Sequence, residues 1–146
     1  MLKSLLISVY GHSYVQHLAH ITQLGTIGYI YPINGDPHIS YSRLEHSMGV
    51  DALACRLGRR LQKMTTSLSP LDPRRISDYH VFVLELAGLL HDVGHGPLSH
   101  QFDLFLQRQE LSLPDHETRG VRLVRYILFD CWTTNQNWHN AFPFGI

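Results

Sequence analysis

Most of the chain carries apolar residues at the spacing of α-helices. The most regular stripe predicts a helix from about Ser42 to Met64, with apolar positions three or four residues apart at Val50, Leu53, Ala54, Leu57, Leu61 and Met64. A shorter stripe predicts a helix from about His12 to Leu24, which ends before Gly25. The pattern therefore predicts an all-α fold.

A third helix is predicted from residue 78 onwards, with Ser77 as its N-terminal cap. This helix is apolar on nearly every side between Val81 and Leu90, which is typical of a segment surrounded by protein. Its polar end residues, His91 and Asp92, are thereby carried into the middle of the domain. Burying such groups costs several kcal/mol unless something pairs with them, and a metal ion would do so.

The periodicity predicts two further helices before it is lost. One is predicted to begin at Pro97, after a break at Gly94 and Gly96, and to pack through Leu98, Phe102, Phe105 and Leu106. The other is predicted to begin near Asp115 and to run to about residue 128. We divide the chain into one domain, residues 1–130, and an unassigned C-terminal tail, residues 131–146.

Two segments between the helices have the composition of turns. Residues 28–36 combine aromatic and β-branched side chains with Pro32 and the pair Asn34-Gly35, which predicts a small β-hairpin or turn. Residues 65–77 are rich in Pro and Ser and are predicted to form a linker.

Composition narrows the class of protein. The chain has 146 residues, 44% of them hydrophobic, which suffices for one buried core. Twelve basic residues balance twelve acidic ones, so neither nucleic acid nor an anionic membrane is an expected partner. Two cysteines are too few for a disulfide scaffold, which indicates an intracellular and not a secreted protein. No apolar run approaches the ~20 residues of a membrane-spanning helix.

Eleven histidines are the unusual feature of the composition. Histidine is the commonest metal ligand. The adjacent His91 and Asp92 offer one nitrogen and one oxygen ligand, and His46 is the candidate for a third. Arg43 lies three residues before His46 on the same side of its predicted helix. This mixed ligand set suits Mn, Fe, Zn or Ni better than Ca.

These residues belong to two longer motifs. Arg43-Leu-Glu-His46-Ser is followed by the run His91-Asp92-Val-Gly-His95-Gly-Pro-Leu-Ser-His100-Gln-Phe-Asp103. Together they resemble the HD-domain metal-dependent phosphohydrolases. They are most similar to the deoxynucleoside triphosphate triphosphohydrolases that pair a SAM domain with an HD domain, over roughly residues 15–128. The resemblance implies an HD-domain helical core, a divalent transition metal ion, Mg²⁺ accompanying the nucleotide and a deoxynucleoside triphosphate as substrate.

The resemblance also implies roles for individual residues. Three match metal ligands: His46, His91 and Asp92. Three match substrate-binding positions at the sugar and the phosphates: Gln23, Leu24 and Arg43. Four match catalytic positions around the α-phosphate: His95, His100, Asp103 and His116.

These residue types suit hydrolysis at the α-phosphorus. A metal ion lowers the pKa of its water and screens the phosphate charge. A histidine oriented by a carboxylate is a suitable general acid for the departing 5′ oxygen. We hypothesise that His100, paired with Asp103, donates that proton while His95 and His116 hold phosphate oxygens. The expected products are a deoxynucleoside and inorganic triphosphate.

The chain departs from this family beyond residue 128. HD enzymes complete the metal site with a later aspartate, and no residue here matches it. The family's later substrate-facing residues, its allosteric nucleotide sites and its SAM domain have no match either. We therefore expect the chain to comprise the N-terminal half of an HD domain, as a fragment or a degenerate relative.

Two other functions stay open. One is an HD phosphatase that acts on nucleoside monophosphates or other phosphate esters, although the pair Gln23-Leu24 and the run from Gly94 to Asp103 favour triphosphates. The other is a catalytically inactive HD fragment that serves as a binding or interaction module. We expect a cytoplasmic or nuclear protein, and whether it forms a homo-oligomer stays open too.

Overall fold

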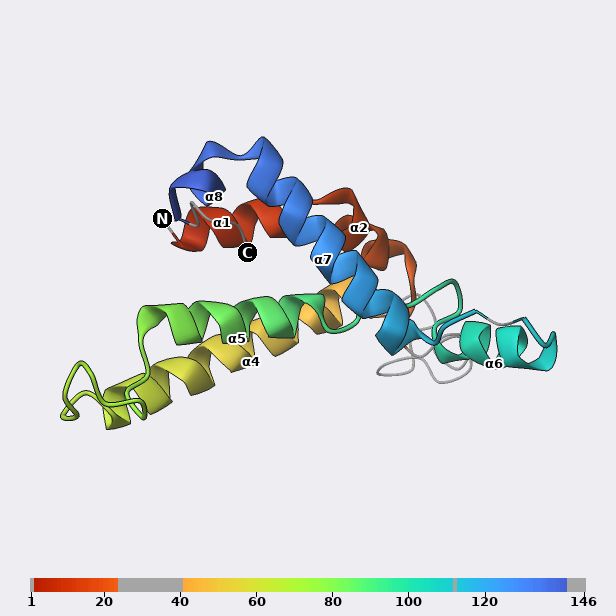
Figure 1. Cartoon of the computed structure of the whole chain (residues 1–146). Coiled ribbons are helices and arrows are strands. Elements are labelled where there is room, and N and C mark those ends of the chain that lie inside the picture. The colour runs from red at the N-terminus through yellow and green to blue at the C-terminus, as the bar shows by residue number, and fades with distance from the viewer. Residues whose placement is uncertain (1, 24–40, 112, 142–146) are drawn as a thin grey trace.

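The computed structural model of the chain describes residues 2–23, 41–111 and 113–141. Within these ranges the one β contact is an isolated antiparallel bridge between Thr22 and Ser42, so the predicted all-α fold is confirmed. The β-hairpin or turn predicted near residues 28–36 lies outside the described residues. The helices are α1 (Leu2–Tyr10), α2 (Ser13–Gln16), the 3₁₀ helix η1 (His17–His20), α4 (Arg43–Met64), α5 (Asp78–Leu90), α6 (His100–Arg108), α7 (His116–Thr134) and α8 (Gln136–Ala141) (Figure 1).

Helices α4 and α5 form a long antiparallel hairpin, as Figure 1 shows. Reciprocal caps fix both starts: Ser42 Oγ accepts from the Glu45 N–H while the Glu45 carboxylate accepts from the Ser42 N–H, and Ser77 and His80 repeat this at α5. The helices approach closely at Gly88, where a Cβ atom would lie 3.0 Å from the Cα of Asp51. This contact sets the position of the C-terminal end of α5 against α4.

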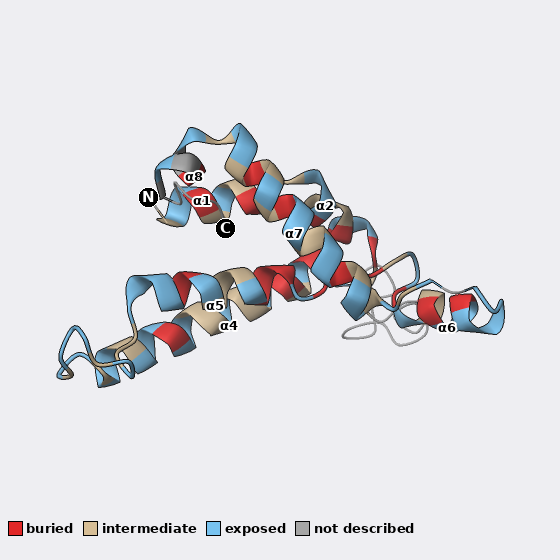
Figure 2. Cartoon of the chain, in the orientation of Figure 1, coloured by how far each residue is buried: buried red, intermediate tan, exposed pale blue. Residues whose placement is uncertain are grey.

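Most of the apolar stripe of α4 is exposed. The helix spans the predicted residues, and much of its length is coloured as exposed in Figure 2. Four apolar residues of its stripe are 39–69% exposed: Leu53, Leu57, Leu61 and Met64. The buried positions of α4 are instead Arg43, Leu44, Ser47 and Gly58. The reason is that the buried face of α4, which packs on α5 and η1, is turned by roughly a quarter of the helix circumference from the stripe.

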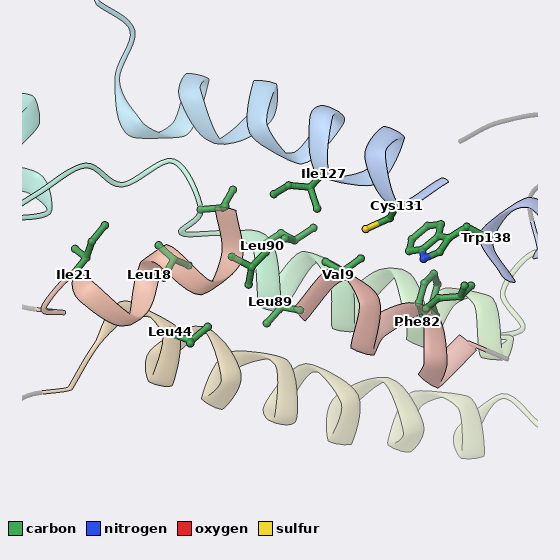
Figure 3. Close-up of a cluster of buried hydrophobic side chains, with 13 residues drawn as sticks. Val9, Leu18, Ile21, Leu44, Phe82, Leu89, Leu90, Ile127, Cys131 and Trp138 are labelled. Carbon is green, nitrogen blue, oxygen red and sulfur yellow. The ribbon is translucent and has the colours of Figure 1, made fainter. Parts of the chain in front are cut away.

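The hydrophobic core lies between α1, η1, α5 and the C-terminal half of α7 (Figure 3). The tail left unassigned by the sequence contributes to it: α7 continues to Thr134, and Trp138 of α8 is 1% exposed. The indole N–H of Trp138 donates to Ser8 Oγ at 2.7 Å, which ties α8 to α1. The helix predicted from His12 to Leu24 is realised as α2 and η1, which together end at His20.

Helix α6 starts later than predicted. Leu98 and Ser99 have φ angles of 62° and 61°, in the left-handed region, so the helix begins at His100 and not at Pro97. Leu98 and Phe105 are more than half exposed, and Leu106 is the buried apolar residue of the helix. Among the described helices, none combines the length and apolarity needed to cross a membrane.

Candidate metal centre and adjoining histidine cluster

The three predicted metal ligands lie together where the start of α4 meets the end of α5. The Nε2 atoms of His46 and His91 are 3.2 Å apart. The Asp92 carboxylate lies 3.3 Å from His91 Nε2 and 3.8 Å from His46 Nε2. One ligand atom from each residue is within 4.8 Å of the other two. The sequence prediction that these residues share a site agrees with this geometry.

The donor set fits a divalent transition metal ion. His91 Nδ1 lies 2.8 Å from the carbonyl oxygen of Gly88, so the ring donates there and keeps a lone pair on Nε2. Asp92 is buried, whereas the rings of His46 and His91 are about one third exposed. Two imidazole nitrogens and a carboxylate oxygen, open to solvent on one side, are a ligand set for Mn, Fe, Zn or Ni.

Arg43 is buried beneath these ligands and is 3% exposed. Its guanidinium donates to the Asp92 carboxylate at 2.6 Å, to Ser99 Oγ and to the carbonyl oxygen of Gln23 at 3.1 Å. Burial acts to raise the pKa of Asp92, but the hydrogen bonds from His95 and Arg43 outweigh it and hold that pKa well below its usual value. Asp92 is therefore charged across the physiological pH range.

Gln23 and His46 both line a hollow of about 360 Å³ with Tyr41, Glu45, Gly49, Val50 and Leu53. The side-chain oxygen of Gln23 is buried and has no hydrogen-bond partner among the described residues. The hollow opens beside the metal ligands, which suits the sugar-facing role implied for Gln23. Leu24, the other predicted sugar-facing residue, lies outside the described residues.

A second cluster, formed by His95, His100 and His116, adjoins the metal ligands. The ring centroids are 4.1 Å apart for His95 and His116, 4.7 Å for His95 and His100, and 5.0 Å for His100 and His116. His95 connects the two groups because its Nε2 lies 3.4 Å from the Asp92 carboxylate. The site residues predicted from the sequence are thus brought together, except that Leu24 is not described.

The pairing of Asp103 differs from the prediction. Asp103 was expected to support His100, but one carboxylate oxygen lies 2.5 Å from His116 Nδ1 and the other accepts from Arg119 at 2.6 Å. Both oxygens are used because the first turn of α7 brings His116 and Arg119 to α6. Burial acts to raise the pKa of Asp103, but the hydrogen bonds from Arg119 and His116 outweigh it, so the pKa is lowered.

The loop between α5 and α6 has no room for a side chain where it meets α7. A Cβ atom on Gly94 would lie 2.0 Å from the carbonyl oxygen of His116 and 2.4 Å from the backbone nitrogen of Gly120. Arg119 reinforces this contact, since it also donates to the carbonyl oxygens of Gly94 at 3.1 Å and Pro114 at 2.5 Å. His95, the residue after Gly94, stacks on His116 beside this backbone contact.

Sequence reasoning missed two residues of the site, Arg119 and Ser99. Arg119 stands one helical turn after His116, a spacing that could have indicated a shared helix face. Nothing in the sequence pairs it with Asp103, sixteen residues earlier. The Ser99 hydroxyl accepts a hydrogen bond from Arg43, and Ser99 itself has a positive φ angle. No pattern in the sequence signals that contact.

The fold and the site define a helical domain in which an adjacent histidine and aspartate are joined by a histidine from another helix. The model of the HD domain family matches residues 43–139, and the chain belongs to this family. It is similar to the deoxynucleoside triphosphate triphosphohydrolase SAMHD1 of Mus musculus (39% identical over 126 residues), Bos taurus (37% over 116) and Homo sapiens (35% over 130). These matches cover 77–87% of this chain and 18–19% of the relatives, so the chain spans about a fifth of their length.

Proposed function

We propose that this chain catalyses the metal-dependent hydrolysis of deoxynucleoside triphosphates to a deoxynucleoside and inorganic triphosphate. The observation that carries the proposal is the contact between two groups of residues with different chemistry. The first group, which can bind a metal ion, is His46, His91 and Asp92. The buried His95 lies 3.4 Å from Asp92 and stacks on His116, which in turn contacts Asp103. A phosphate that reaches the ion also reaches these histidines.

When bound, the metal ion supplies an activated water molecule and screens the charge of the phosphates. Arg43 balances the charge of Asp92 and holds it beneath the site through a charge-assisted hydrogen bond at 2.6 Å. The hollow beside His46 holds the deoxyribose, with the unpartnered side-chain oxygen of Gln23 as a polar contact.

Protonation of the leaving group is assigned to His116. Water adds to the α-phosphorus, the bond from that phosphorus to the 5′ oxygen breaks, and the 5′ oxygen takes up a proton. His116 is the ring whose Nδ1 is held by a carboxylate, which fixes the tautomer and stabilises the charged ring. His95 and His100 flank it and contact phosphate oxygens.

The test is a product analysis with Mn²⁺ and each deoxynucleoside triphosphate, in parallel with nucleoside monophosphates. We expect inorganic triphosphate and deoxynucleoside in equal amounts. His116→Gln is expected to lower the rate by about 10²–10⁴-fold. The matched control is His80→Gln, because His80 is exposed in the first turn of α5, at the opposite end of that helix from His91, and glutamine can keep the capping contact with Ser77.

Other outcomes would overturn the proposal. Orthophosphate released from monophosphates would identify the chain as a phosphatase. A folded, metal-loaded chain without turnover would identify it as a binding module.

A further inference from the structure

Half of the basic residues of the chain lie at one end of the α4–α5 hairpin. This hairpin end, residues 56–75, comprises the C-terminal part of α4 and most of the loop that follows it. It contains six of the twelve basic residues of the chain and one of the twelve acidic ones. Figure 1 shows it projecting away from the other helices. The chain as a whole is neutral, but this end of it is strongly positive.

Most of these positive charges are not neutralised within the chain. Arg59 pairs with Asp78 at 2.5 Å, and Arg74 pairs with Asp72 at 2.8 Å. The other four basic residues of the hairpin end make no ion pair with any residue that the structure describes: Arg56, Arg60, Lys63 and Arg75. The first three are exposed on α4. The hairpin end therefore attracts an anionic partner.

An exposed apolar stripe runs beside the basic residues of α4. Each of these basic residues comes directly before an apolar residue of the stripe, in the pairs Arg56-Leu57, Arg60-Leu61 and Lys63-Met64. Successive residues of a helix are about 100° apart, so the basic and apolar stripes run parallel along α4. Gly58, one residue after Leu57, packs on Val81 of α5. The apolar stripe therefore lies between the basic stripe and α5.

The loop adds another exposed apolar residue to the hairpin end. Leu71, between Pro70 and Pro73, is 93% exposed. A single exposed leucine is ordinary on a protein surface. Here it accompanies the three apolar residues of α4, so four aliphatic side chains are exposed at the same end of the hairpin as the unpaired charges.

We propose that the hairpin end binds the surface of an anionic lipid bilayer. A helix with an exposed aliphatic stripe and basic residues beside it is typical of segments that lie in the bilayer interface. The aliphatic side chains enter the headgroup region, while the arginine and lysine side chains contact the anionic headgroups. Such a segment lies on the bilayer and does not cross it. The balance of charge over the whole chain predicts no such partner, because it averages over this local excess.

Two other partners fit the hairpin end less well. Single-stranded nucleic acid stacks its bases on aromatic side chains, and residues 56–75 contain no aromatic residue. A second copy of the chain, packed symmetrically through α4, would bring the basic stripes of the two copies together, and like charges repel each other. An anionic bilayer complements both the charge and the apolar stripe.

The test is sedimentation of the full chain with lipid vesicles. We expect binding to vesicles that contain about one third phosphatidylserine, and at least tenfold weaker binding to vesicles of phosphatidylcholine alone. The double variant Arg60→Gln, Lys63→Gln should bind at least tenfold more weakly, because each basic side chain near the bilayer contributes about fivefold. Met64→Gln should bind at least fivefold more weakly, because each buried methylene contributes about fourfold.

Matched controls change the same residue types elsewhere on the surface. The double variant Lys3→Gln, Arg122→Gln removes two exposed charges from α1 and α7. Ile7→Gln replaces a residue of α1 that is 69% exposed, as Met64 is. Both controls should bind the anionic vesicles like the wild type. Circular dichroism reports whether each variant is folded, and all the substituted side chains are exposed.

Three results would overturn the proposal. The first is equal binding to the two kinds of vesicle, or equal losses in the variants and their controls. The second is binding that the loss of charge weakens but Met64→Gln does not, since that pattern identifies a patch for any polyanion, such as an oligonucleotide. The third is a dimer that Met64→Gln dissociates, without vesicle binding. The vesicle assay needs neither metal nor nucleotide, so its outcome is independent of the proposed hydrolysis.

Discussion

At the scale of single residues, the site depends on a few positions where the chemistry or the packing permits only one type of residue. The grouping of His46, His91 and Asp92 could be predicted, because metal chemistry restricts the residue types and a buried His-Asp pair requires compensation. The ion-pair partner of Asp103 could not be predicted from the sequence, since a carboxylate on α6 can pair with any cationic side chain that the tertiary fold places beside it. Arg119 is that cation, and its position depends on the packing of α7.

Gly94→Ala is expected to lower the free energy of unfolding by about 3 kcal/mol, because the added methyl group meets the backbone of His116 and Gly120, which cannot rotate away. Urea denaturation measures the change. Gly49→Ala is the matched control, since nothing lies within 4 Å of its Cβ position in the middle of α4, and it should stabilise by about 0.5–1 kcal/mol. Equal effects of the two substitutions would contradict the close approach at Gly94.

Arg119→Ala is expected to cost about 2 kcal/mol of stability, because it removes donors to Asp103, Gly94 and Pro114 together. Arg122→Ala, on the exposed side of the same helix, should change stability by less than about 0.5 kcal/mol. Thermal or urea unfolding of both variants checks this, and a loss no larger in Arg119→Ala than in Arg122→Ala would refute the linking role.

At the scale of elements, the sequence predicted α4 and α5 well and α6 less well. Long apolar periods and serine caps define the first two locally, so their starts agree with the structure, whereas α5 ends at Leu90 and not at Asp92 as predicted. The start of α6 depends on two left-handed residues that no local preference demands, since neither Leu98 nor Ser99 is a glycine. The exposed stripe of α4 shows that periodicity identifies an apolar face without identifying what packs on it.

The interface of α4 and α5 contains a carboxylate that is unfavourable at neutral pH. Burial and the nearby charge of Glu85 raise the pKa of Asp51. A group whose pKa is higher in the folded state contributes fully to stability below its unfolded-state pKa, which is about 3.9 for aspartate. This contribution is lost as the pH rises through the folded-state pKa. Asp51→Asn should therefore stabilise the chain by about 0.5–1 kcal/mol at pH 7 and make no difference near pH 3.

Urea unfolding of Asp51→Asn across this pH range provides the measurement. Asp78→Asn is the control, because hydrogen bonds from Gln62 and Arg59 lower the pKa of this exposed residue, so its replacement brings no gain at pH 7. A constant difference between wild type and Asp51→Asn at every pH would contradict the electrostatic cause.

At the scale of the whole molecule, the described fold has one core with two open apolar faces. One is the stripe on α4, and the other is a groove of about 590 Å³ between α5 and α7 that reaches His91. Val83 and Val121, both about half exposed, line this groove. The core of the described residues extends to α8 and includes Trp138, which composition could not show.

Trp138→Ala is expected to destabilise the chain by about 3–4 kcal/mol, because its buried indole connects α8 to α1 and to Phe82. Trp138→Phe keeps most of the packing and loses the hydrogen bond to Ser8, so it should cost about 1 kcal/mol. Circular dichroism during urea unfolding measures both without relying on the fluorescence of the residue that is replaced. Wild-type stability of Trp138→Ala would show that α8 is not part of the core.

The central claim is that the trio and the adjoining histidines hydrolyse a deoxynucleoside triphosphate at its α-phosphorus. Its most direct test is hydrolysis in ¹⁸O-labelled water with Mn²⁺, followed by mass analysis of the products. We predict that the label enters inorganic triphosphate and not the deoxynucleoside, and that Asp92→Asn forms neither product. Label recovered in orthophosphate or diphosphate, or no turnover by a folded and metal-loaded chain, would contradict the account.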